Sequence, residues 1–422
     1  MTALPSHLLP DTAEVDDDGR LTIGGCDVIA LAEEHGTPLF VYDEAHLRAR
    51  CREAVTAFPD GVAYASKAFL CRAIAALAHE EGMLVDVASG GELHVALAAG
   101  VPAERLVLHG NNKSDDELRE ARAAGVGTIV VDSFDELDRL GRLHAEDGLV
   151  PRVLVRVTPG VEAHTHDFVR TGQVDSKFGF GLAAGDAARA VARAGDSPAV
   201  ELAGVHMHIG SQVFVADFFH QAIEVVAPWL RDLALPELSI GGGLGVAYVA
   251  GEEAPTITEW ATSVRDACAA AGITSRITAE PGRAIVAAAA VTLYRVGTVK
   301  ALPGIRTYVS VDGGMSDNPR PVLYGSGYET FLPRATFSER TRTVTVVGKH
   351  CESGDVLVKD AVVPEDLVVG DILATPVTGA YGHSMGSNYN KVPRPAVLFV
   401  ADGAARRVVR RETYDDLLRC DQ

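Results

Sequence analysis

Apolar and polar positions alternate along the chain in two distinct ways. From about residue 38 to residue 281, short β-branched or apolar runs are each followed by a longer amphipathic stretch rich in Ala, Leu, Glu and Arg. Residues 62–66 followed by 67–82, and 84–89 followed by 90–100, show this pattern, which is typical of repeated β/α units. Further strands are predicted at 38–42, 105–109, 128–132, 152–158, 201–209, 237–240 and 276–279.

Eight or nine such strands, spaced by about 20 to 50 residues, predict an α/β fold with a closed (β/α)8 barrel of the TIM type. After Pro281 the helical periodicity nearly vanishes, and Val- and Thr-rich runs lie between Gly and Pro residues, which predicts a mostly β domain of sandwich or small-barrel type. Residues 21–29 are interpreted as a lone strand that this β domain recruits. The expected domains are an N-terminal segment 1–35, a barrel 36–285 and a C-terminal β domain 286–422.

The composition describes a globular, acidic protein. Apolar residues make up 47% of the chain and charged residues 23%, as in proteins that bury a core. Lys and Arg total 38 against 57 for Asp and Glu, giving a net charge of −19. Because such a charge repels nucleic-acid phosphates and anionic bilayers, we expect neither nucleic acid nor membrane among the partners.

Cysteine usage and the start of the chain predict a cytoplasmic location. The N-terminus lacks a basic start followed by a long apolar stretch, and the most apolar window, 284–293, is about half the ~20 residues of a membrane-spanning helix. The six cysteines are scattered singly without a C-x-x-C pair, which favours reduced thiols. They are Cys26, Cys51, Cys71, Cys268, Cys351 and Cys420.

Four groups suited to cofactor chemistry stand at the ends of predicted strands. Lys67 follows residues 62–66, the Gly-rich segment 241–245 follows another strand, and Glu280 precedes Pro-Gly-Arg. His206 and His208 share one face by the two-residue period of a strand. Taken singly, these features are more often a solvated lysine, a turn and structural histidines. Together they predict a pocket for pyridoxal phosphate, with a Schiff-base lysine and an acid for the pyridine nitrogen.

Ordered motifs over nearly the whole chain resemble one enzyme family. The sequence is similar to the diaminopimelate decarboxylases, barrel-type pyridoxal phosphate enzymes related to ornithine and arginine decarboxylases and more distantly to alanine racemase. The motifs are VAYASKAF (62–69), LHGNNKS (108–114), VRVTPGVEAHTH (155–166), KFGFGL (177–182), HMHIGSQ (206–212), GGGLG (241–245), EPGR (280–283), DGGMSDNPRPVLYG (312–325), CESGD (351–355) and GAYGHSMGSNYN (379–390).

The resemblance implies an activity and an assembly. The expected reaction is the pyridoxal-phosphate-dependent decarboxylation of meso-2,6-diaminopimelate to L-lysine and CO2, the last step of lysine biosynthesis. The expected assembly is a homodimer in which the Cys351 loop of one subunit completes the active site of the other. No metal is expected.

The resemblance also assigns roles to individual residues. Lys67 would hold the cofactor covalently, Glu280 would keep its pyridine nitrogen protonated, and Cys351 would protonate the carbanion carbon. The remaining expected cofactor contacts are His208 on the ring face, Ser211, Gly243, Gly245, Gly282, Arg283 and Tyr381 at the phosphate, and Asp86 nearby. The expected substrate contacts are Arg283, Arg320, Tyr324 and Tyr381, with Glu352 meeting the far ammonium group.

Three other interpretations were weighed. A decarboxylase of ornithine, lysine or arginine is disfavoured because Glu352 and the Arg320 segment suit a diacid substrate. A metal-dependent barrel hydrolase could use His206 with His208 and His164 with His166, but such hydrolases place an H-x-H pair before the bridging lysine. A binding protein without turnover is the third alternative, and nothing in the sequence signals lost chemistry.

Overall fold

The computed structural model describes residues 5–161, 175–214 and 217–422. The chain divides into a barrel unit and a β unit, which are described separately below. The barrel unit comprises Arg50–Gly245 and Ala254–Ala284, and the β unit comprises Met1–Ala49, Val246–Glu253 and Ile285–Gln422.

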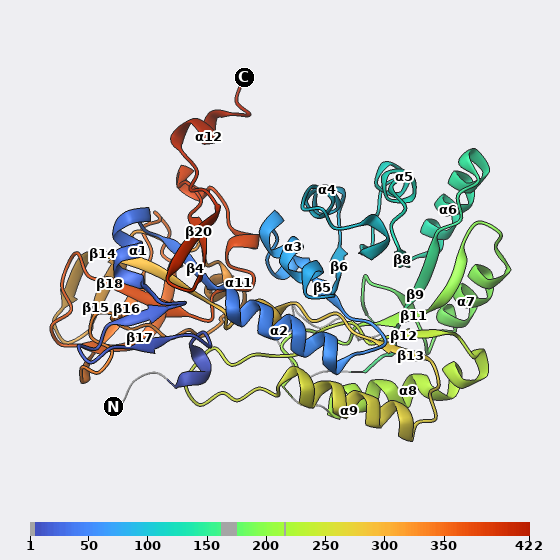
Figure 1. The fold of residues 1–422 in the computed structure, drawn as a ribbon, viewed down its shortest axis with the longest axis horizontal. Coiled ribbons are helices and arrows are strands. Elements are labelled where there is room, and N and C mark those ends of the chain that lie inside the picture. Colours follow the sequence, from blue (N-terminus) through green and yellow to red (C-terminus); the bar gives the residue numbers. More distant parts are fainter. Residues whose placement is uncertain (1–4, 162–174, 215–216) are drawn as a thin grey trace. The chain divides into compact units, whose positions relative to one another are not determined.

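Among the described residues, eight parallel strands form the ring of the barrel unit, in the order β13-β12-β11-β9-β8-β7-β6-β5 (Figure 1). The ring closes between its first and last strands, where Val62 bridges Ala279 and the Ala63 amide donates to the Ala279 carbonyl at 2.9 Å. The expected (β/α)8 barrel is therefore confirmed. The strands are β5 (Ala63–Ala65), β6 (Leu84–Val87), β7 (Leu106–Leu108), β8 (Thr128–Val131), β9 (Arg152–Thr158), β11 (Glu201–Met207), β12 (Glu237–Ser239) and β13 (Arg276–Thr278), with β10 (Phe180–Gly181) beside β9.

Helices α3 to α9 lie on the outer side of these strands (Figure 1). Helix α2 fills the position between α9 and α3, because Glu53 accepts from the Thr258 amide at 3.0 Å and Arg52 pairs with Glu81 at 2.6 Å. The helices are α2 (Glu44–Ala57), α3 (Arg72–Glu80), α4 (Gly90–Ala98), α5 (Asp115–Ala124), α6 (Phe134–Asp147), α7 (Asp186–Asp196), α8 (Asp217–Leu233), α9 (Ile257–Ala270) and α10 (Arg283–Val286).

Local sequence marks where these helices begin and end. Ser114 accepts from the Glu117 amide while Glu117 accepts from the Ser114 amide, a capping box that starts α5. Gly125, in the left-handed conformation, ends the same helix. Each helix returns the chain to the amino end of the next strand, so the barrel strands all run in one direction.

The β unit is built mainly of antiparallel strands, as expected for the C-terminal half. Its main sheet has the order β17-β16-β15-β14-β4-β19-β20, with β18 beside β14, and a small sheet holds β1, β2 and β3. Its elements are β1 (Glu14–Val15), β2 (Leu21–Ile23), β3 (Cys26–Asp27), α1 (Val28–His35), β4 (Leu39–Asp43), β14 (Ala290–Leu302), β15 (Arg306–Val311), α11 (Arg320–Tyr324), β16 (Arg340–Val347), β17 (Val356–Pro364), β18 (Ile372–Pro376), β19 (Ala396–Ala401), β20 (Ala404–Val409) and α12 (Tyr414–Leu418).

Two details of the sequence interpretation were wrong. Residues 21–29 are not one lone strand, because Gly24 and Gly25 adopt positive φ angles and turn the chain into the β2–β3 hairpin. The strand predicted at 38–42 is not a barrel strand, because β4 pairs with β14 and β19 in the main sheet of the β unit. Every residue of β4 is buried, so its apolar run suits either kind of sheet.

Candidate active site

Polar side chains collect at the carboxyl ends of the barrel strands, where active sites of this fold are built. Lys67 lies in a 3-10 turn directly after β5, and Asp86 lies near the end of β6. His109 follows β7, His208 follows β11 and Glu280 follows β13. Because the strands are parallel, the structure brings the predicted Lys67, Asp86, His208 and Glu280 to one end of the barrel, together with His109, which was not predicted.

Glu280 is the centre of a buried hydrogen-bond network. Its Oε1 accepts from Ser239 Oγ at 2.9 Å, and its Oε2 lies 2.9 Å from His206 Nε2. His109 Nε2 lies 3.6 Å from both Glu280 Oε1 and Asp86 Oδ1. An ionised carboxylate can only accept a hydrogen bond, so His206 Nε2 carries the ring proton and donates the hydrogen bond to Glu280 Oε2. His206 Nδ1 has no partner among the described residues.

The electrostatics of this network separate two carboxyl groups. Burial raises the pKa of Glu280, but the neighbouring His206 and His109 and the hydrogen bonds from His206 and Ser239 outweigh it, so its pKa lies well below the usual range. Burial and the charge of Glu280 raise the pKa of Asp86 well above the usual range. Burial lowers the pKa of His109 to about 4. Glu280 is thus the stronger acid of the site, and Asp86 is the weaker one.

Glycines beside Glu280 let the loops at the strand ends approach one another closely. A Cβ on Gly242 would lie 2.3 Å from the Glu280 carbonyl oxygen, and one on Gly243 would lie 2.3 Å from the Gly210 carbonyl oxygen. Gly243 also has φ +117°, a conformation that side chains rarely adopt. A Cβ on Gly282 would lie 2.7 Å from the Ala65 carbonyl oxygen. These positions require glycine.

Hydroxyl, guanidinium and imidazole groups surround the same glycines. Arg283 Nη2 donates to Ser211 Oγ at 2.9 Å, and His208 Nδ1 accepts from the Gly242 amide at 3.2 Å. Burial lowers the pKa of His208 well below its usual value, so the ring is neutral. The Gly245 amide donates to the Val213 carbonyl at 3.0 Å, so Gly245 contributes close approach and not a free amide.

This donor set fits pyridoxal phosphate. An ionised, buried carboxylate suits a protonated pyridine nitrogen, a neutral imidazole suits a ring face, and glycine amides with a serine and an arginine suit a phosphate. Lys67 is exposed at the same end of the barrel, and its charge acts on both Asp86 and His208. A primary amine, an acid and a phosphate cradle therefore lie together in the barrel unit.

The predicted substrate residues Arg320 and Tyr324 lie in the β unit, on α11. Arg320 is only 5% exposed, which contradicts its alternative interpretation as a solvated surface residue. Its guanidinium lies 4.1 Å from the centre of the Tyr248 ring, and Nη1 donates to Tyr328 Oη at 2.7 Å. Tyr324 is half-buried, and Tyr381 has φ +59°. Arg320 is held in one orientation, as recognition of a planar carboxylate requires.

Cys351 and Glu352 are exposed on a loop that a buried carboxylate anchors. Asp355 accepts from the His350 amide at 2.9 Å and from the Met315 amide at 2.6 Å, which joins the 351–355 loop to the 312–325 segment. The Cys351 amide donates to Asn390 Oδ1 at 2.9 Å. The loop is fixed at its base, while both predicted functional side chains face outward.

Sequence reasoning missed two residues of the Glu280 network, His109 and Ser239. It singled out His206 but missed the hydrogen bond between His206 and Glu280. The signal was available, because each occupies an inward position of its strand by the two-residue period. What the sequence lacks is the pairing of distant strands that brings these three side chains to Glu280.

Only one of the two histidine pairs considered as metal ligands lies within the described residues. His206 bonds to Glu280 and His208 to a backbone amide, whereas His164 and His166 lie outside the described residues. The donor atoms of His109, His206 and Glu280 all lie within 4.8 Å of one another. This cluster shares Glu280 with the cofactor site described above.

Comparison with known proteins decides between a pyridoxal phosphate enzyme and a metal-dependent one. A family model described as the pyridoxal-dependent decarboxylase, pyridoxal binding domain, matches residues 44–287. Diaminopimelate decarboxylases of Mycobacterium tuberculosis and Bacillus subtilis are each 47% identical to the chain, and each match covers 98% of both sequences. The chain belongs to the diaminopimelate decarboxylases.

Solved structures of the family agree. A diaminopimelate decarboxylase from M. jannaschii superposes with a TM-score of 0.91 at 33% identity, covering 98% of each chain. The same enzyme has been solved in co-complex with L-lysine. The expected reaction is therefore confirmed: the chain is a pyridoxal-phosphate-dependent carboxy-lyase that converts diaminopimelate to L-lysine and CO2 in the final step of lysine biosynthesis.

Proposed function

We propose that the residues gathered at the carboxyl end of the barrel perform this decarboxylation in the roles that the sequence resemblance implies. The observation that carries the proposal is the ionised Glu280, held by His206 and Ser239 at the end of the barrel that also presents Lys67. Bound pyridoxal phosphate supplies an electron sink for the electron pair left when the substrate carboxylate departs as CO2.

Each residue of the barrel unit has a distinct task. Lys67 would provide the primary amine that holds the cofactor covalently. Glu280 keeps a proton at the pyridine nitrogen, and His208 packs on the ring face. Ser211 and the backbone of Gly282 and Arg283 would hold the phosphate together with the Gly-rich segment 241–245, and the hydrogen bond from Arg283 Nη2 to Ser211 Oγ fixes the serine hydroxyl.

The β unit supplies the groups for the far half of the substrate. The far end of diaminopimelate carries both a carboxylate and an ammonium group, so recognition needs both signs of charge. The fixed guanidinium of Arg320 with Tyr324 suits the carboxylate, and Glu352 suits the ammonium group. Cys351 provides the proton to the carbon that loses CO2, and the anchored loop supports this role.

We also propose a homodimer with shared active sites. The β unit also exposes large apolar side chains: Val322, Leu323 and Tyr389 are 40%, 47% and 41% exposed, and the Tyr389 ring lies 5.5 Å from the ring of His350, which precedes Cys351. Tyr389 adjoins Asn390, which anchors Cys351. A partner covering these side chains would bury the apolar patch, and the two-fold symmetry of a dimer would complete two sites at once.

The cytoplasm is the proposed location. All six cysteines are free thiols, which suits a reducing compartment. No helix in the described parts of the chain has the length and apolar character needed to cross a membrane.

The direct test is an assay of CO2 release with meso-diaminopimelate, lysine, ornithine and arginine. We expect release from diaminopimelate alone, and we expect Lys67→Ala to lose turnover together with the absorbance band near 420 nm that borohydride removes from the wild type. Wild-type turnover by Lys67→Ala would refute the assignment of Lys67. Comparable release from ornithine or arginine would refute the assignment of Arg320 and Glu352 to a diacid.

A further inference from the structure

The interior of the barrel combines bulky apolar side chains with small or polar ones. Ala63 on β5, Ser239 on β12 and Thr278 on β13 put small or polar side chains into the middle layer. Barrels of this fold ordinarily fill this layer with bulky branched side chains. The same layer also holds the bulky side chains of Leu84, Val107, Val130 and Leu154.

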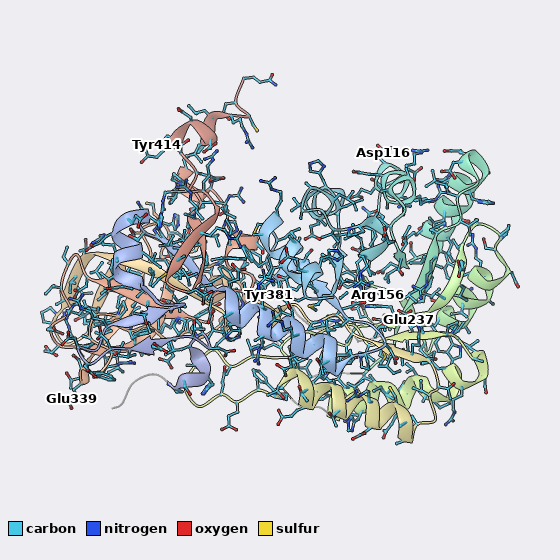
Figure 2. The ribbon with its side chains drawn as sticks, viewed as in Figure 1. Asp116, Arg156, Glu237, Glu339, Tyr381 and Tyr414 are labelled. Carbon is cyan, nitrogen blue, oxygen red and sulfur yellow. The ribbon has the colours of Figure 1, made fainter. Side chains whose placement is uncertain are left out.

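A cavity of about 450 Å³ lies in the barrel interior, and its lining includes Leu84, Val107 and Leu154 as well as Ala63, Ser239 and Thr278. It begins at the amino ends of the strands, among Arg152, Glu237 and Arg276, and its lining extends to Ser239 and Glu280. Its outer end meets solvent, because the Arg276 and Arg152 side chains are 55% and 28% exposed. Both arginines pair with Glu237, which Figure 2 labels. The residues that line the cavity therefore range from the floor of the barrel to Glu280 of the cofactor site.

Polar groups line the cavity along its length. Arg276 Nη2 donates to Glu237 Oε2 at 2.7 Å, and Thr278 Oγ1 donates to Glu237 Oε1 at 3.2 Å. Thr278 pairs with Ser239 in the β12–β13 register, and Ser239 Oγ donates to Glu280 Oε1. Thr278 remains partly exposed although it lies inside the ring. A polar cavity of this size holds ordered water, which needs two to four polar partners.

We propose that this cavity is a second solvent entrance, which brings water and protons to Glu280 from the floor of the barrel. The proposal rests on the assignment of Glu280 to the pyridine nitrogen. Substrate and cofactor occupy the carboxyl end of the barrel during turnover. The floor then remains the route by which the Glu280 side of the site equilibrates with bulk solvent.

Thiol labelling tests whether the entrance exists. Thr278→Cys places a thiol in the cavity, and Val130→Cys is the matched control, because Val130 is not among the residues that line the cavity and is 1% exposed. Leu84→Cys is a second cavity variant, since Leu84 also lines the cavity. Each variant is treated with methyl methanethiosulfonate as apoenzyme and as holoenzyme saturated with L-lysine, and site-resolved mass spectrometry separates the native cysteines.

We expect labelling at position 278 to be roughly 100-fold faster than at position 130, where a thiol reacts only after local unfolding. We also expect position 278 to react at the same rate, within about twofold, with and without cofactor and lysine. Equal labelling at positions 278 and 130 would overturn the entrance. Labelling at 278 that slows about tenfold or more on cofactor loading would show access through the substrate mouth, and would also overturn it.

Proton exchange tests what the entrance does. In lysine-saturated holoenzyme carrying ¹⁵N-labelled cofactor, we expect Thr278→Val to slow solvent exchange of the pyridine N–H roughly tenfold, while Thr278→Ser exchanges like the wild type. Unchanged exchange in Thr278→Val would overturn the proton route. If the nitrogen carries no proton at all, the assignment of Glu280 fails, whereas the labelling contrast between positions 278 and 130 is unaffected.

Discussion

His206 Nε2 lies 2.9 Å from Glu280 Oε2, although these two residues are 74 positions apart in the sequence. Together with Ser239, His206 gives the buried carboxylate two donors and keeps it ionised. His206 therefore acts on the cofactor through Glu280, as a positioning residue.

Replacing His206 with Ala should weaken the cofactor site. Glu280 would lose a donor in a buried place, which costs about 1.5–3 kcal/mol for a hydrogen bond to a charged group. We expect cofactor affinity to fall roughly tenfold or more, and the pH at which the bound cofactor changes its absorbance to shift, because burial then raises the pKa of Glu280.

His206→Gln, which retains a donor, should restore part of the affinity. His94→Ala, on the exposed face of α4, is the control and should behave like the wild type. A spectral pH profile in His206→Ala identical to that of the wild type would show that His206 is merely structural.

Gly243→Ala should damage the phosphate cradle. The added methyl group would lie 2.3 Å from the Gly210 carbonyl oxygen at a backbone φ of +117°. We expect cofactor affinity, measured by absorbance titration, to fall at least about tenfold. Gly141→Ala, a position on α6 with no neighbour within 4 Å, should leave the affinity unchanged. Equal affinities in the two variants would remove Gly243 from the cradle.

Asp317 in the β unit should make stability depend on pH. Burial, with the charges of Asp355 and Asp312, raises the pKa of Asp317 to about 7, although Tyr294 and the Gly314 amide donate to it. Between its unfolded value near 4 and 7, the folded protein binds the extra proton. Stability must therefore fall as pH rises through this window, by at most about 1.4 kcal/mol per pH unit.

Asp317→Asn should remove this part of the pH dependence, as urea unfolding midpoints at pH 5, 6 and 7 would measure. The exposed Asp421→Asn is the control and should keep the wild-type slope. A parallel decline in the wild type and Asp317→Asn would assign the pH dependence to other groups.

Glu352→Gln should impair use of diaminopimelate. Losing the charge that meets the far ammonium group should lower kcat/KM by roughly tenfold to a hundredfold. Glu365→Gln, another exposed glutamate of the β unit, is the matched control. An unchanged kcat/KM would show that Glu352 does not contact the substrate.

Shared active sites predict complementation between two inactive variants. Lys67→Ala and Cys351→Ala, unfolded together and refolded as a mixture, should recover roughly a quarter of wild-type activity, because half of the dimers are mixed and each has one intact site. Absence of activity, with mixed dimers detected by mass, would mean that Cys351 acts within its own chain or not at all.

Much of the fold could be predicted from local sequence. The predicted strand at 152–158 matches β9, and the predicted strands at 105–109 and 276–279 each lie within two residues of an observed one. Hydrophobic periodicity and the positions of Gly and Pro are local properties of the chain. The pattern of β/α units and the change after Pro281 can therefore be recognised from the sequence alone. The strand ends also placed Lys67 and Glu280 correctly at one end of the barrel.

The sequence by itself determined the element types, the family motifs and the residues that could carry chemistry. Tertiary structure alone decided which sheet took residues 39–43, because a fully buried strand suits either. It also decided that Arg320 is buried against Tyr248, and that His109, His206 and Ser239 converge on Glu280. These contacts join residues far apart along the chain, and only the closure of the ring and the burial of charge fix them.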